Sequence, residues 1–91
     1  MEEERRKGRG KQMARVASIL FLLQLLEREA SGANCEDIEK LKDELKLYTD
    51  AKNANDWNGM ANAAAGIGDL IGRLTGGGPT MAGAVAADLT P

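Results

Sequence analysis

Residues 12–53 read QMARVASILFLLQLLEREASGANCEDIEKLKDELKLYTDAKN, and this stretch carries the pattern that decides the fold. Its first half has apolar residues at every third or fourth position, which is the spacing of a helix face. They form two adjacent stripes: Met13, Val16, Leu20 and Leu23, and beside them Ile19, Leu22 and Leu26. Two stripes make a wide apolar face. We therefore predict a helix over residues 12–31 that needs more than one neighbour.

The second half predicts another helix, over residues 35–53. Gly32 suits the left-handed residue that follows a helix, and Asn34 is a typical N-cap. The next helix has one narrow apolar stripe, which consists of Ile38, Leu41, Leu45 and Tyr48. One neighbour is enough to cover such a stripe, and the preceding helix is expected to supply it. Because the connection is short, the two helices should form an antiparallel hairpin.

A third helix is expected over residues 57–75, with apolar residues again three or four apart: Trp57, Met60, Ala64, Ile67, Ile71 and Leu74. Gly66, Gly68 and Gly72 lie inside it, and each costs about 1 kcal/mol relative to alanine in an exposed helix. Two interpretations remain open. Either Gly68 and Gly72 permit close packing against another helix, or the helix is frayed and becomes ordered only on binding.

Both ends of the chain are expected to be flexible. Residues 1–11 lack a periodic apolar pattern and form a basic arm, whereas Gly76-Gly77-Gly78-Pro79 begins a flexible tail over residues 76–91. For residues 81–87 of this tail, the alternative is a short helix or a docking peptide. The fold class is therefore all-α: a 12–75 helical domain with a hairpin and a glycine-containing third helix, between an arm and a tail.

The charges are distributed unevenly along the chain. Residues 1–15 hold six basic residues and three glutamates, a balance of +3, whereas the rest holds six basic and eleven acidic residues, a balance of −5. Such an arm is a candidate for contact with nucleic acid or an anionic surface. The candidate residues are Arg5, Arg6, Lys7, Arg9, Lys11 and Arg15. A solvated terminus, or contact with the acidic body of a neighbouring subunit, would explain the same charges.

The residues that catalysis needs are missing from this composition. There is no histidine, so the commonest general base and metal ligand is absent. Cys35 is the only cysteine, and it has no base to activate it. The acidic residues of 36–44 point away from the predicted apolar stripe, as a solvated face would. We expect no enzyme activity, no catalytic or metal-binding residues and no cofactor.

The sequence leaves the location of the protein open. No apolar run reaches the 18 residues of a membrane-spanning helix. A basic start, an apolar run and Ser31-Gly32-Ala33 are similar to a secretory signal, but Glu27, Arg28 and Glu29 interrupt the pattern. A cytoplasmic location is therefore favoured, with secretion as the alternative.

The excess apolar surface predicts a non-enzymatic interaction or assembly component, which self-associates or docks on a protein partner through apolar helix faces. The candidate contact residues are Val16, Ile19, Leu20, Leu23, Leu26, Ile67, Ile71 and Leu74. The alternative is a nucleic-acid-binding accessory protein that uses the basic arm.

Overall fold

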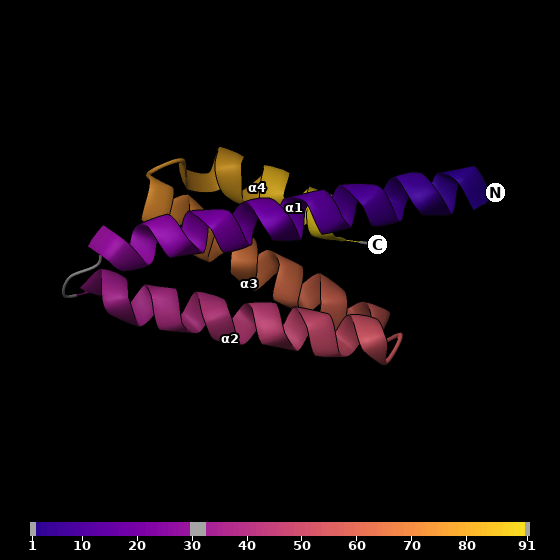
Figure 1. Ribbon diagram of the computed structural model, residues 1–91, viewed down its shortest axis with the longest axis horizontal. Helices are drawn as coiled ribbons and strands as arrows, with labels where there is room; N and C mark the ends of the chain where they lie inside the picture. The colour runs from indigo at the N-terminus through magenta and orange to yellow at the C-terminus, as the bar shows by residue number, and fades with distance from the viewer. Residues whose placement is uncertain (1, 30–32, 91) are drawn as a thin grey trace.

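The computed structural model describes residues 2–29 and 33–90, with side chains described for 10–29 and 34–90. These residues form four α-helices and no strand (Figure 1). The helices are α1 (Glu2–Glu29), α2 (Ala33–Asn53), α3 (Trp57–Thr75) and α4 (Gly78–Leu89). The described part of the chain is therefore all-helical. The cap expected at Gly32 lies outside the described residues.

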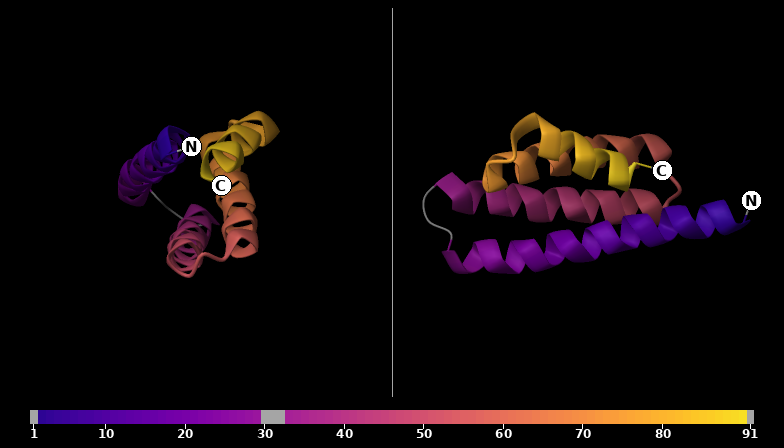
Figure 2. Two further views of the ribbon diagram at one scale, coloured as in Figure 1. Left: turned by 90° about the vertical axis from the view of Figure 1, so that its right-hand side faces the viewer. Right: turned by 90° about the horizontal axis from the view of Figure 1, so that it is seen from above.

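The helices follow one another back and forth, and α1 runs in the opposite direction to α2 (Figure 2). α2 packs chiefly against α3, and α3 against α4, whereas α1 contacts α4 more than α2. The sequence predicted that the first helix would cover the apolar stripe of α2. This prediction is wrong, because α3 covers most of that stripe. Ala63 and Ala64 are buried on α3. Small side chains of this kind let two helix backbones approach closely, whereas the leucines and Ile19 of α1 hold its backbone farther from α2.

α1 begins at Glu2, about ten residues before the expected start, and its N-terminal end projects beyond the other helices (Figure 1). The expected arm of residues 1–11 is thus helical from residue 2. Gly8 and Gly10 each weaken a helix by only about 1 kcal/mol, and the Glu, Arg and Lys residues around them are good helix formers. No helix among the described residues combines the length and the apolar character that a bilayer crossing requires.

α4 replaces most of the flexible tail expected at residues 76–91. Gly76 ends α3 in the left-handed conformation (φ 73°), and Gly78 also has a positive φ of 62°. Pro79 then lies in the first turn of α4, where its missing N–H costs nothing. Val85 and Leu89 are 1% and 0% exposed, so their burial holds this helix on the body of the protein.

Two glycines of α3 face α4. A Cβ atom at Gly68 would lie 2.5 Å from the carbonyl oxygen of Ala82, and one at Gly72 would lie 2.7 Å from that of Gly78. Any side chain at these positions would push the two helices apart. The close packing that this glycine pair permits is therefore between α3 and α4 of the same chain.

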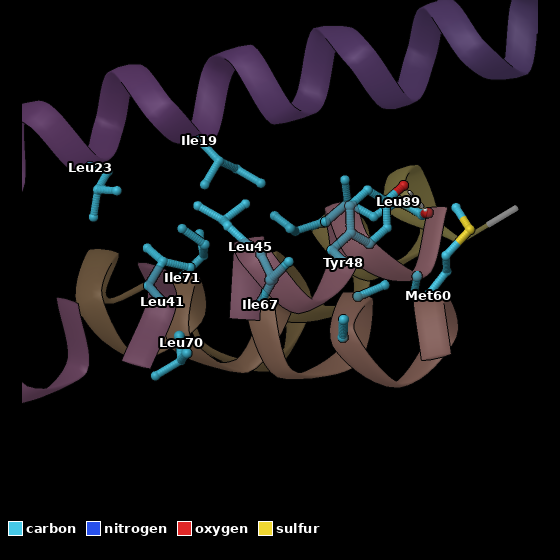
Figure 3. Packing of buried hydrophobic residues seen from close by; sticks show 14 of the residues in the cluster. Ile19, Leu23, Leu41, Leu45, Tyr48, Met60, Ile67, Leu70, Ile71 and Leu89 are labelled. Carbon is cyan, nitrogen blue, oxygen red and sulfur yellow. Dashed lines mark hydrogen bonds between the residues drawn. The ribbon is translucent and has the colours of Figure 1, made fainter. Parts of the chain in front are cut away.

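The core between the helices is almost entirely aliphatic, and Tyr48 is the aromatic residue in it (Figure 3). The Tyr48 hydroxyl donates a hydrogen bond of 2.7 Å to the carbonyl oxygen of Leu89. Gln12 Nε2 donates to the same oxygen at 3.4 Å. Burial raises the pKa of the Tyr48 hydroxyl, which stays protonated and able to donate. The end of α4 is thus anchored by polar groups from α1 and α2.

Candidate protein-interaction surface

α1 has one face in the core and an opposite face in solvent. Ile19 and Leu23 point from α1 toward the other helices (Figure 3) and are 2% and 7% exposed. With 3.6 residues per turn, the residues two before and two after Ile19 lie on the other side of the helix. These are Ala17 and Phe21, which are both exposed. Phe21 has 65% of its surface exposed although it is the only phenylalanine of the chain.

The solvent face of α1 is apolar along its central turns. Four large apolar side chains are exposed there: Met13 at 63%, Leu20 at 47%, Phe21 at 65% and Leu25 at 44%. Together they expose on the order of 400 Å² of apolar surface, comparable with the largest patches of monomeric proteins, which are often functional. We define the α1 outer face as these four residues with the exposed residues among them: Met13, Ala14, Ala17, Ser18, Leu20, Phe21, Gln24 and Leu25.

A shallow groove of about 250 Å³ adjoins the α1 outer face on the side of α4. Its α1 wall consists of the apolar Ile19, Phe21, Leu22 and Leu25 together with Arg15 and Ser18. Residues of α3 and α4 form the rest, among them Met81, which is 37% exposed. The groove extends the apolar surface beyond α1, so a partner on the outer face can also place a side chain between α1 and α4.

Ion pairs hold α1 against the body near both ends of the outer face. Arg15 Nε donates to Asp88 Oδ2 of α4 at 2.8 Å, and Lys11 Nζ lies 3.3 Å from Oδ1. The hydrogen bond from Arg15, assisted by Lys11, lowers the pKa of the Asp88 carboxyl. At the other end, Lys42 Nζ of α2 lies 2.7 Å from Glu27 Oε1. These contacts keep Ile19 turned inward and the outer face turned to solvent.

The hydrogen bond from Lys42 to Glu27, with a second to Glu39 at 3.3 Å, raises the pKa of the Lys42 amine. All three side chains are substantially exposed. Surface pairs of this kind contribute little to stability, so they orient α1 more than they stabilise it.

The structure separates the residues predicted for partner contact into three groups. Ile19, Leu23, Ile67 and Ile71 are buried in the core of the chain itself, where a partner does not reach them. Val16, Leu26 and Leu74 are half-buried against that core. Of the predicted set, Leu20 alone is exposed.

The sequence reasoning missed Phe21 and Leu25 as surface residues because they lie outside the two stripes that it followed. Met13 belongs to one of these stripes but was not among the predicted contact residues, and it is 63% exposed. A signal for Phe21 and Leu25 was present: residues 16–26 carry no charge on any side of the helix. A helix that is apolar all round needs partners on every side.

The residues predicted for nucleic-acid contact are only partly described. The side chains of Arg5, Arg6, Lys7 and Arg9 lie outside the described ones. Lys11 and Arg15 both pair with Asp88, so their charges serve a contact within the chain. Arg15 is also half-buried, which limits its access to phosphates.

Other chemically interesting groups do not gather into a site. Cys35 is exposed near the start of α2 and forms no disulfide. Among the side chains of residues 10–29 and 34–90, no three Cys, Asp or Glu side chains are grouped so that they could hold a metal ion. No family model, no curated protein and no solved structure matches this chain.

Proposed function

We propose that this protein is a non-enzymatic interaction or assembly component that binds another protein surface through the α1 outer face. The observation that carries the proposal is the exposure of Met13, Leu20, Phe21 and Leu25 on one side of a helix whose other side is already packed. Leaving the only phenylalanine of the chain in water forgoes the free energy that its burial would contribute.

The free energy gained by covering the α1 outer face indicates a reversible contact. Covering about 400 Å² of apolar surface at roughly 25 cal/mol per Å² yields on the order of 10 kcal/mol before the costs of association. Lost translation and rotation, and the ordering of side chains, take back much of this free energy. The free energy that remains corresponds to a weak, reversible contact.

We further infer that α1 and α2 act as an antiparallel helical hairpin in which α1 presents this face. The pairing of Lys42 with Glu27 and the burial of Leu23 support the inference. The hairpin would let α2, α3 and α4 serve as a rigid base while α1 makes the contact.

A photo-reactive amino acid placed at position 21 tests the proposal. p-Benzoylphenylalanine in place of Phe21 is expected to give a covalent adduct on illumination of the cells that produce the protein. The matched control is the same amino acid in place of Leu47, which is 56% exposed on α2, away from the outer face. An adduct at 21 and none at 47 supports the proposal. Equal yields at both positions, or none at either, would overturn it.

A further inference from the structure

We propose that the occupant of the α1 outer face is a second copy of this chain, with the two α1 helices packed antiparallel and crossing at Ile19. This inference rests on the proposed function and names the partner of the same surface. Ile19 is the most buried apolar residue of α1, at 2% exposure. The middle of the exposed ridge therefore lies directly behind it.

The ridge is complementary to itself when it is reversed. A two-fold axis through the height of Ile19 sets each Phe21 against Ala17 of the second copy. The same axis keeps each flank of α1 against the same flank of the second copy, so it brings Leu25 next to Ala14 and Met13 next to Gln24. Large side chains then meet small or flexible ones, which is how two helices interdigitate without leaving voids. Every partner in these pairs is an exposed residue, so the dimer forms without moving α1 off its own core.

The large side chains near the centre of the ridge also favour the antiparallel arrangement. A parallel arrangement would instead set Phe21 against Phe21, and the two rings would compete for the same space between the helices. An interface of this symmetry also closes on itself, so the assembly ends at two copies.

The available area meets what a specific dimer needs. Two outer faces, with the neighbouring edge of the groove at Met81, bury on the order of 1,000–1,500 Å² in total, the lower part of the range for stable pairs. We therefore expect a reversible dimer with a Kd on the order of 10 µM.

Sedimentation velocity from about 1 to about 300 µM measures this equilibrium. The test variant is Leu25→Asp and the matched control is Leu47→Asp, since both leucines are exposed on helices. Leu25→Asp is expected to weaken the dimer at least about tenfold, because it places a carboxylate in an apolar contact. Leu47→Asp should leave the Kd unchanged. Ala17→Glu is a second test variant that keeps a good helix former, and circular dichroism checks the folding of all three.

A distance between spin labels tests the direction of the helices. A label at position 28 (Arg28→Cys, in a Cys35→Ser background) lies nine residues from the crossing. The two labels of an antiparallel dimer are then about 27 Å apart along the helices, at 1.5 Å per residue. In a parallel dimer they would be separated by little more than the distance between helix axes, about 10 Å.

The outcomes separate this inference from the proposed function. A dimer that Leu25→Asp and Ala17→Glu weaken, with the long label distance, supports both. The same dimer with the short distance overturns the antiparallel contact and leaves the proposed function standing. A chain that stays monomeric at all concentrations overturns the dimer, and the adduct mass at position 21 then shows whether a different protein binds. A dimer that neither variant weakens overturns the α1 contact between copies, and the adduct at position 21 then decides the proposed function by itself.

Discussion

Arg15 of α1 donates a hydrogen bond of 2.8 Å from its Nε atom to Asp88 of α4, although the two residues lie 73 positions apart in the chain. Lys11 approaches the other oxygen of the same carboxylate at 3.3 Å. This contact ties the first helix to the last one. It orients α1 so that Ile19 faces the core and Phe21 faces solvent.

Asp88→Asn is expected to destabilise the protein at neutral pH, since the amide loses the charge that Arg15 and Lys11 contact. The pKa of Asp88 is lowered from 3.8 in the folded protein. Its carboxylate therefore stabilises the fold above that pH, and the contribution is lost as the pH falls through the folded-state pKa. Thermal unfolding of both proteins from pH 7 downward should show the gap in Tm closing below about pH 4. A constant gap would contradict this account.

Gly68→Ala and Gly83→Ala should change stability in opposite directions. A methyl group at Gly68 would lie 2.5 Å from the Ala82 carbonyl oxygen, whereas one at Gly83 would meet nothing within 4 Å. Gly83→Ala should raise the free energy of unfolding by up to about 1 kcal/mol through helix propensity alone. Gly68→Ala should lower it by roughly 1–3 kcal/mol, because α3 and α4 must separate. Urea unfolding gives both values, and two changes of the same sign would refute the close contact.

Tyr48→Phe should lower the free energy of unfolding by about 1 kcal/mol, which is the usual net value of a buried hydrogen bond. The Leu89 carbonyl oxygen keeps only the longer bond from Gln12, at 3.4 Å. Thr90→Ala is the control, because Thr90 is exposed and its hydroxyl bonds within its own helix end. It should change stability by less than about 0.5 kcal/mol. A neutral Tyr48→Phe would show that this bond does not anchor α4.

The double variant Lys11→Gln, Arg15→Gln separates the intrachain role of these residues from a nucleic-acid role. We expect a lower Tm, because Asp88 loses both partners. We expect no change in the affinity for an unspecific DNA or RNA duplex measured over a salt series. A drop in affinity with a smaller salt dependence would instead assign both residues to phosphate contact.

Several helix boundaries follow from local chemistry that is visible in the sequence. Asp56 accepts a hydrogen bond of 3.0 Å from the Gly59 N–H and so caps the start of α3. Gly76 ends the same helix because glycine adopts a positive φ without strain. Both are preferences of single residues, and they do not depend on the tertiary contacts of the helix.

α4 was expected only as an alternative, a short helix within residues 81–87, and the flexible tail was preferred to it. Residues 80–87 are mostly alanine and other small residues, which define no apolar stripe of their own. They form a packed helix because the glycine face of α3 accepts them closely. The N-terminal extension of α1 was missed for the opposite reason, since glycine signals were given more weight than the good helix formers around them.

The α1 outer face was likewise determined partly by the sequence and partly by the tertiary structure. The sequence alone determined that the chain is helical and that residues 16–26 carry more apolar surface than one neighbour can cover, since periodicity and charge are properties of the chain itself. Which side of α1 is buried was decided only by the tertiary structure. The Asp88 contact and the packing around Ile19 assign one stripe to the core. Phe21 and Leu25 are left on the outside because a helix can turn only one face toward its own body.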